Sequence, residues 1–247
     1  MQPYYTQYFE INDLTVDRFG RMKPSAMLYT IQEAAGGHCN ELQLDYDRLS
    51  QRNLFWAVIR HRLQVTRLPK RGETIRVETW PLPTTRAAFP RSVVAYDEEG
   101  NECFRAISLW VLMDKNTRNM ILPGKSGIMV PGQIRGNELP APGSLVPGNL
   151  LHHESRVIRF TDLDRNGHMN NTRYLDWISD LLPSSFHESH TVKDFTICYH
   201  AEGMEGQDLE IAWEVSAEGF LNVDASHSRE EEQHRTFSAR LEYEDVL

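Results

Sequence analysis

Two stretches of the chain, DRFGRMKPSAMLYTI at residues 17–31 and DRNGHMNNTRYLDWI at residues 164–178, align without a gap. Asp, Arg, Gly, Met, Leu and Ile coincide between them. A second pair follows in the same order, VTRLPKRGETIRVETW (65–80) over YHAEGMEGQDLEIAWE (199–214), with one matching glycine and a matching apolar alternation after it. Recurrence in the same order predicts that the chain contains two copies of one folding unit.

A break rich in proline and glycine separates the two copies. Residues 131–148 hold four Pro and four Gly and show no apolar periodicity, which is typical of a linker. We therefore predict an N-terminal repeat over residues 1–130, a linker over residues 131–151 and a C-terminal repeat over residues 152–247.

Each copy is expected to hold one helix followed by several strands. In the first copy, apolar residues at helical spacing predict a helix that starts near Ser25 and ends at Gly36-Gly37. In the second copy, Asn170 or Asn171 is the predicted N-cap and Pro183 the predicted end.

The strands are predicted from a different periodicity. Apolar and polar residues alternate over residues 75–79 and 209–215, as in half-exposed strands, whereas residues 106–114 (AISLWVLMD) are apolar on both faces, as in a central strand. One helix against an antiparallel sheet in each copy places the fold in the α+β class.

The composition argues against nucleic-acid and membrane proteins. The net charge of −9 is unsuited to a nucleic-acid partner, which requires a basic face. The longest apolar run, residues 54–59, is far shorter than the roughly 18 residues of a membrane span. The N-terminus lacks the features of a secretory signal. The three cysteines, Cys39, Cys103 and Cys198, are isolated in the sequence, which is typical of reduced thiols. We expect a cytoplasmic protein.

The densest polar cluster of the chain lies directly before the predicted second helix. Its members are Asp164, Asn166, His168, Asn170 and Asn171. A helix N-terminus offers unpaired N–H groups that can stabilise an oxyanion, and a carboxylate beside an imidazole is a usual means of activating water. Turn bonds and helix capping would also explain these residue types.

The first copy separates these two interpretations, because it lacks most of the polar set. Its equivalent positions hold Asp17, Phe19, Arg21, Lys23 and Pro24. Glu202 likewise stands where the first copy has Leu68. If folding needed the His and Asn side chains, both copies would hold them, so the asymmetry favours chemistry in the second copy.

A metal site is not expected. The segment His187-Glu188-Ser189-His190 contains ligand types but has no further ligand at a telling spacing.

At these residues the chain resembles a known family. GHMNNTRY at residues 167–174 resembles the helix-entry motif of hotdog-fold thioesterases, and the longer pattern from Asp164 to Asn171 resembles the acyl-acyl-carrier-protein thioesterases more narrowly. Residues 55–81 and 105–123 resemble that family's tryptophan-containing strand and its Arg-Ala-x-Ser-x-Trp-Val-x-Met-Asp segment. The resemblance covers nearly the whole chain and weakens after about residue 215.

The resemblance implies a tandem double hotdog, in which two long helices are each wrapped by an antiparallel sheet. The family's catalytic residues fall on Asp164, Asn166, His168 and Glu202. The residues expected to bind substrate are Asn170 and Asn171 at the helix entry and Met27, Leu28 and Ile31 for the acyl chain in the first copy. The plant enzymes carry a Cys directly after the catalytic Glu, whereas this chain has Gly203, so a Cys-His mechanism is not available at that position.

The implied function is hydrolysis of acyl-acyl carrier protein to a free fatty acid, without metal or nucleotide. General-base catalysis and covalent attack by Asp164 both stay open, since both need a carboxylate near the carbonyl. Three alternative functions also stay open: an acyl-CoA thioesterase, a hotdog dehydratase and a non-catalytic acyl-chain-binding module.

The expected partner is acyl carrier protein. Because that partner is acidic and this chain is acidic too, contact requires a local basic patch. The candidates are Arg60, Arg62, Arg67, Lys70 and Arg71 in the first copy and Arg165 and Arg173 beside the motif. The sequence leaves monomer and homodimer open.

Overall fold

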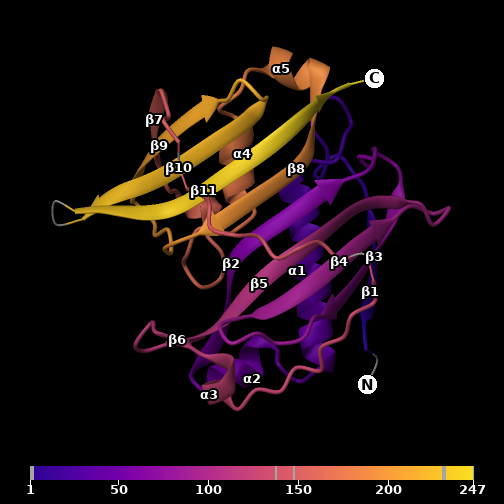
Figure 1. Cartoon of the computed structure of the whole chain (residues 1–247), viewed down its shortest axis with the longest axis vertical. Coiled ribbons are helices and arrows are strands. Elements are labelled where there is room, and N and C mark those ends of the chain that lie inside the picture. The colour runs from indigo at the N-terminus through magenta and orange to yellow at the C-terminus, as the bar shows by residue number, and fades with distance from the viewer. Residues whose placement is uncertain (1–2, 137, 147, 230–231, 247) are drawn as a thin grey trace. The chain divides into compact units, whose positions relative to one another are not determined.

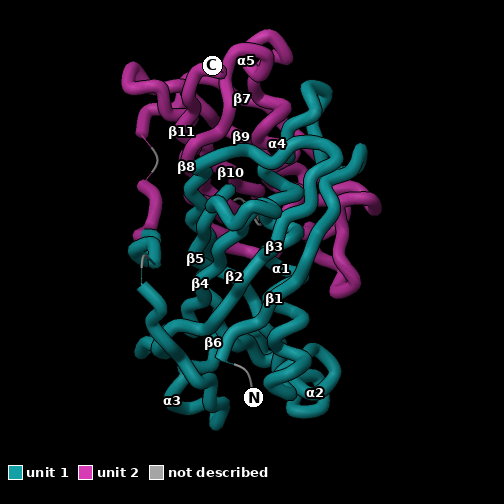
Figure 2. Tube along the Cα trace, turned by 90° about the vertical axis from the view of Figure 1, so that its right-hand side faces the viewer, with its two compact units in different colours: residues 1–142 teal, residues 143–247 magenta. Residues whose placement is uncertain are grey.

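The chain forms two compact units, Met1–Pro142 and Gly143–Leu247 (Figures 1 and 2). The computed structural model describes residues 3–136, 138–146, 148–229 and 232–246. The boundary between the units falls inside the predicted linker.

The first unit is an antiparallel sheet packed on a long helix. Its helices are α1 (Pro24–Glu41), α2 (Tyr46–Gln51) and α3 (Pro123–Ser126). Its strands are β1 (Tyr5–Glu10), β2 (Leu54–Val65), β3 (Thr74–Pro81), β4 (Phe89–Tyr96), β5 (Glu102–Asp114) and β6 (Met120–Ile121). They lie in the order β1-β3-β4-β5-β2, and β6 pairs with β5. The strand predicted as central, β5, is paired on both sides, by β4 and β2.

Helix α1 is longer than predicted, because it continues through Gly36-Gly37 to Glu41. It begins at Pro24, whose fixed φ suits the first helical position. A Cβ atom at Gly37 would lie only 2.5 Å from the Tyr5 ring. The glycine therefore serves close approach between β1 and α1, and this packing outweighs the low helix propensity that had indicated a helix end.

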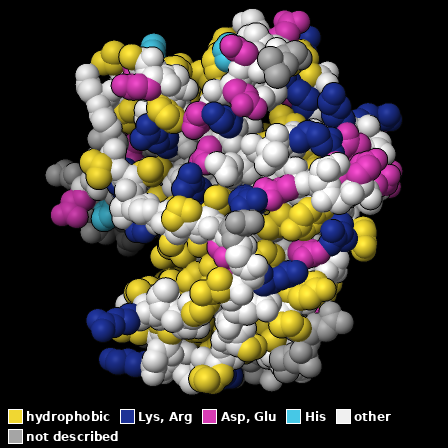
Figure 3. Space-filling view, turned by 45° about the vertical axis from the view of Figure 1, so that its right-hand side comes forward, with side chains coloured by type: hydrophobic (Ala, Val, Ile, Leu, Met, Phe, Trp, Pro, Cys, Tyr) yellow, Lys and Arg dark blue, Asp and Glu magenta, His cyan; other side chains and the backbone are white. Residues whose placement is uncertain are grey.

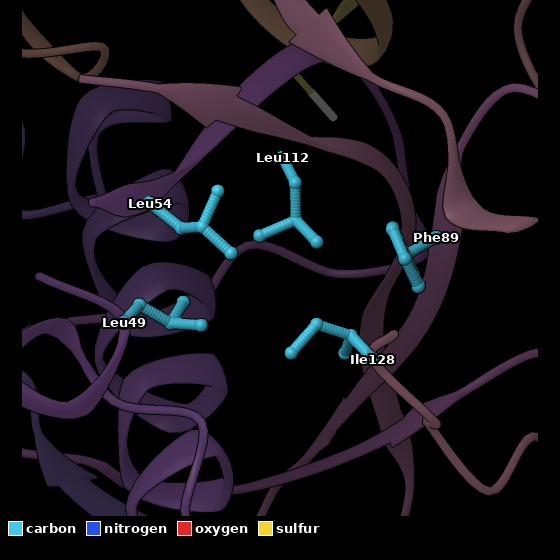
Figure 4. Close-up of a cluster of buried hydrophobic side chains, with 5 residues drawn as sticks. All are labelled: Leu49, Leu54, Phe89, Leu112 and Ile128. Carbon is cyan, nitrogen blue, oxygen red and sulfur yellow. The ribbon is translucent and has the colours of Figure 1, made fainter. Parts of the chain in front are cut away.

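One apolar cluster of this unit lies where α2 and the residues that follow α3 meet the sheet. Its five buried side chains point toward one another in Figure 4. They are Leu49, Leu54, Phe89, Leu112 and Ile128. Trp56 and Trp110 pack against the cluster. This cluster anchors the short helices to the sheet, separately from the α1 side chains.

The second unit repeats the plan with shorter helices. Its helical elements are η1 (Phe160–Asp162), α4 (Arg173–Ser179) and α5 (Ser184–Ser189). Its strands are β7 (His152–Val157), β8 (His190–Tyr199), β9 (Asp208–Val215), β10 (Phe220–Arg229) and β11 (Glu232–Asp245). They lie in the order β8-β11-β10-β9-β7, and neighbouring strands are antiparallel.

Helix α4 differs from its prediction at both ends. Its N-cap is Thr172 rather than Asn170 or Asn171, and it ends at Ser179. Pro183 instead precedes α5. The helix packs on the sheet through Tyr174, whose ring meets Tyr199 and Phe237 with centroids 5.4 and 4.8 Å away. The α+β class is confirmed, but only one of the two helices is long.

The linker has no helix or strand among its described residues, yet it packs on the sheet of the first unit. The Gln133 N–H donates to the Pro81 carbonyl at 2.9 Å. Arg135 lies against the Trp80 ring and forms an ion pair with Glu78 at 3.0 Å. This part of the linker is therefore bound to the sheet of the first unit.

Candidate active site

The predicted site is built by two loops of the second unit. One comprises residues 158–172, between β7 and α4, and the other residues 200–207, between β8 and β9. The Met169 N–H donates to the Gly203 carbonyl at 2.8 Å, and the Gly206 N–H donates to the Ile158 carbonyl at 2.9 Å. These backbone bonds hold the two loops side by side.

A tight turn around Asp164 shapes the first loop. One carboxylate oxygen, Oδ1, accepts the backbone N–H groups of Asn166 and His168 at 2.7 and 3.2 Å. The other oxygen accepts the Asn166 side-chain amide at 3.2 Å. Gly167 has a φ of +78°, a conformation that glycine adopts without strain. Asp164 therefore stabilises the turn that presents His168.

His168 and Glu202 face each other across the two loops. The distance from His168 Nδ1 to Glu202 Oε1 is 3.5 Å. The His168 side chain is 11% exposed and that of Glu202 is 38% exposed, so the carboxylate reaches solvent while the imidazole is mostly covered. The backbones of His168 and Met204 form an isolated antiparallel β-bridge. A carboxylate beside an imidazole is a suitable pair for moving a proton.

The two asparagines before α4 are occupied in shaping the loop. The Asn170 side-chain oxygen accepts the N–H and the hydroxyl of Thr172, at 3.0 and 2.9 Å, and the Asn170 N–H donates to Asp162. The Asn171 carbonyl accepts the Tyr199 hydroxyl at 2.9 Å. The N–H groups of Asn170 and Thr172 are thus engaged within the loop, and the role of Asn170 and Asn171 in substrate binding stays a prediction.

The first unit contains the same turn without the reactive side chains. Asp17 Oδ1 accepts the N–H groups of Phe19 and Arg21 at 2.8 and 3.0 Å, and the Met22 N–H donates to the Pro69 carbonyl at 2.8 Å. These bonds match those of Asp164 and Met169 one for one. The predicted equivalence of the two loops is confirmed at the level of individual hydrogen bonds.

Sequence reasoning missed one residue of the site, Tyr174. Its ring is buried on α4, and its phenol oxygen lies against the backbone of Gly203, 2.8 Å from where a Cβ atom of that residue would stand. Burial raises the pKa of Tyr174, and the charges of Asp164 and Glu202 raise it further. The repeat alignment held a signal for this residue, because the equivalent position in the first copy is Met27.

Gly203 is packed so closely that an added Cβ atom would force its neighbours to shift. A Cβ atom there would lie 2.8 Å from the Tyr174 hydroxyl and 2.7 Å from Ile158 Cδ1. At the position where the plant enzymes carry a Cys, this chain thus has a glycine, and the Tyr174 phenol fills the space beside it.

The residues predicted to bind the acyl chain lie on α1. Met27, Leu28 and Ile31 are each completely buried in the first unit. They belong to a different compact unit from His168 and Glu202. Their role in acyl binding stays a prediction.

The cysteines and the segment first considered for metal binding have ordinary structural surroundings. Burial raises the pKa of Cys39, and it raises the pKa of Cys103 to about 11, so neither thiol is activated. His187 Nε2 bonds the Ser179 carbonyl at 2.8 Å. Over the described ranges, no three His, Cys, Asp or Glu side chains gather as a metal site would require.

Several of the basic candidates are paired with carboxylates. Arg67 contacts Glu73 at 2.8 Å, Arg71 pairs with Asp13, and Arg173 lies between two Asp side chains of its own unit. Figure 3 shows acidic and basic side chains interspersed on the face that it presents. The local positive field is therefore weaker than the sequence suggests. The role of all seven basic candidates in docking the carrier protein stays a prediction.

A membrane-spanning helix is absent from the part of the chain that the structure describes, since each helix there is too short or too polar.

Family comparisons extend over most of the chain. The model of the acyl-ACP thioesterase N-terminal domain matches residues 2–122, and that of the acyl-ACP thioesterase C-terminal domain matches residues 151–245.

Similar proteins include plant enzymes. A chloroplastic palmitoyl-acyl carrier protein thioesterase of Gossypium hirsutum is 26% identical over 246 residues, covering 89% of this chain and 57% of the relative. A chloroplastic dodecanoyl-[acyl-carrier-protein] hydrolase of Cinnamomum camphora is 29% identical over 199 residues, covering 72% and 50%. The chain thus spans about half the length of these relatives.

Solved structures match nearly end to end. An acyl-ACP thioesterase from Bacteroides thetaiotaomicron superposes with a TM-score of 0.85 at 23% identity, with 98% of each chain covered. The 12:0-ACP thioesterase from Umbellularia californica gives a TM-score of 0.84 at 24% identity, covering 100% of this chain and 99% of that one. These matches confirm the predicted fold class.

Proposed function

Because the chain belongs to the acyl-ACP thioesterase family, we propose that it hydrolyses the thioester of acyl-acyl carrier protein and releases a free fatty acid. One observation carries this proposal. The pair formed by His168 and Glu202 is present in only one of two loops that are otherwise hydrogen-bonded alike. A side-chain pair that the fold does not need is best explained by chemistry.

In the proposed reaction, Glu202 acts as the general base. Its carboxylate is the more exposed member of the pair and takes a proton from a water molecule, whose oxygen attacks the thioester carbonyl carbon. The carbon–sulfur bond then breaks, and the proton passes through His168 to the leaving thiolate. The separation of 3.5 Å is long for a hydrogen bond, but catalytic contacts often tighten only when substrate is bound.

Asp164 is assigned a positioning role rather than that of a nucleophile. Both of its oxygens accept hydrogen bonds within the turn, which reduces the electron density available for attack on a carbonyl. Asp17 makes the matching backbone bonds in the first unit, where no reactive pair is present. The proposal therefore favours activation of water over a covalent intermediate.

Acyl specificity is assigned to the first unit. Met27, Leu28 and Ile31 offer an apolar surface on α1, and no counterpart of the His168–Glu202 pair lies at the equivalent positions Arg21 and Leu68. The acidic carrier protein is the proposed partner, and the cytoplasmic location stays a prediction.

The test is release of free thiol from acyl-acyl carrier protein and acyl-CoA substrates of several chain lengths. We expect a higher kcat/KM on the carrier-protein substrate. A preference for acyl-CoA would favour the second candidate, an acyl-CoA thioesterase. Binding of acyl-acyl carrier protein without any release of thiol would contradict the proposal and support a binding module.

A further inference from the structure

We propose that the phenols of Tyr174 and Tyr199 are positioning groups of the active site, each fixing one of its two loops from inside the second unit. This inference rests on the proposed function and deepens it. Neither residue contacts the reacting atoms in the proposed reaction. They act through the backbone of the residues that do.

Tyr174 fixes the loop that carries Glu202. Its phenol oxygen lies against the backbone of Gly203, 2.8 Å from where a Cβ atom of that residue would stand, and the Gly203 carbonyl accepts the Met169 N–H at 2.8 Å. The backbone directly after Glu202 is thus packed against the phenol, and the next carbonyl, that of Gly203, is bonded to the other loop. Because a peptide is planar, fixing it limits the directions in which the Glu202 side chain can leave the backbone.

Tyr199 fixes the loop before α4. Its hydroxyl donates to the Asn171 carbonyl at 2.9 Å, three residues after His168. The two rings pack against each other with centroids 5.4 Å apart and an interplanar angle of 64°, as aromatic pairs prefer. The two loops are therefore tied to one rigid aromatic pair.

The first unit provides the comparison that separates a functional role from a structural one. The positions equivalent to Tyr174 and Tyr199 hold Met27 and Val65, so the same fold forms without either hydroxyl. Both phenols are present only in the copy that also holds the His168–Glu202 pair.

The surroundings keep both phenols neutral. Burial raises the pKa of Tyr174 and of Tyr199 well above the ordinary value. Each hydroxyl therefore remains protonated throughout the physiological range, and its contact with the loop does not change with pH. This constancy suits a group that maintains geometry rather than one that exchanges a proton.

We expect substitutions at Gly203 and at Tyr174 to have coupled effects on kcat. A Cβ atom at Gly203 would lie 2.8 Å from the Tyr174 hydroxyl, so the phenol and a side chain at this position compete for the same space. Ile158 Cδ1 is also close, at 2.7 Å, but it is the end of a flexible side chain that can move aside.

The first experiment compares Tyr174→Phe with Tyr243→Phe. Tyr243 on β11 is a matched control, because burial also raises its pKa and its ring packs on Phe186 rather than on the site loops. We expect Tyr174→Phe to lower kcat about 10- to 100-fold, the scale of a small misplacement of reacting groups, with KM nearly unchanged. Tyr199→Phe should act in the same direction. If kcat of Tyr174→Phe equals that of the control, the inference is overturned.

The second experiment is a double-mutant cycle between Tyr174→Phe and Gly203→Ala. Alone, Gly203→Ala should lower kcat, because the new methyl group displaces the phenol and the peptide that it holds. With the hydroxyl already removed, the same substitution should cost much less. Strictly additive effects would contradict the coupling.

The wild-type chain distinguishes this inference from the proposed function. If wild type releases no thiol from acyl-acyl carrier protein, the proposed function fails and the inference fails with it. If wild type is active and Tyr174→Phe behaves like Tyr243→Phe, only the inference fails.

Discussion

The loop before α1 and the loop before α4 share a hydrogen-bond pattern but direct their side chains differently. In the first, Arg21 turns back to its own turn residue, Asp17, at 3.1 Å. In the second, His168 occupies the same position and faces Glu202 on the neighbouring loop. We therefore propose that the aspartate common to both loops stabilises the turn, whereas His168 and Glu202 carry out the chemistry.

The largest expected effect is that of Glu202→Gln. Removing a general base should lower kcat by about 10² or more, and the fold should persist, because the equivalent first-unit position is filled by Leu68. The control is Glu205→Gln, which alters an exposed carboxylate of the same loop. Thiol release is the measurement. Equal losses in both variants would mean that the His168–Glu202 pair has no special role.

Met27→Trp tests whether the first unit sets the acyl chain length. Each methylene excluded from an apolar site is worth about 0.8 kcal/mol, so losing two to four should shift the preference between long and short chains by about one to two orders of magnitude. Tyr29→Trp, on an exposed position of the same helix, is the control.

The same variant has a second interpretable outcome. If Met27 is ordinary core, a tryptophan overpacks it and destabilises the unit by about 1–3 kcal/mol. The melting temperature would then fall while the chain-length profile stays unchanged, and acyl specificity would have to be sought elsewhere.

Salt should affect the two kinds of substrate unequally. Because Arg67 and Arg71 are already paired with carboxylates, we expect kcat/KM on acyl-acyl carrier protein to fall only about fivefold as the screening length drops from about 10 to 3 Å. Activity on a short uncharged thioester should hardly change. An identical salt response for both substrates would argue against a basic docking patch.

The smallest expected effect is that of Asp164→Asn. Asparagine keeps the Oδ1 acceptor that the turn uses, so we expect kcat to fall by about threefold or less and the melting temperature to stay near that of wild type. A loss of about 10² or more in kcat, without a change in stability, would restore Asp164 as a nucleophile or base.

The equivalence of the two loops could be predicted from sequence because few residues determine it. An aspartate accepts the backbone N–H groups two and four residues later, and a glycine with positive φ, Gly20 or Gly167, follows three residues after it. Such local chemistry is visible in an alignment of the two copies.

The features that sequence missed depend on contacts between distant residues. Gly36-Gly37 does not end α1, because Tyr5 packs against Gly37. The Asn170 side chain bonds Thr172 instead of capping the helix directly. The contact of Tyr174 with Gly203 joins a helix to a loop 29 residues later, and no periodicity indicates it.

The most direct test of the proposed division of roles replaces the equivalent residue of each loop, His168 or Arg21, with alanine. Thiol release from acyl-acyl carrier protein is then measured. His168→Ala should lower kcat by about 10² or more while the melting temperature stays near that of wild type. Arg21→Ala, which removes the ion pair with Asp17, should leave kcat near wild type. Comparable kcat values for the two variants would contradict the claim that chemistry resides in the second copy alone.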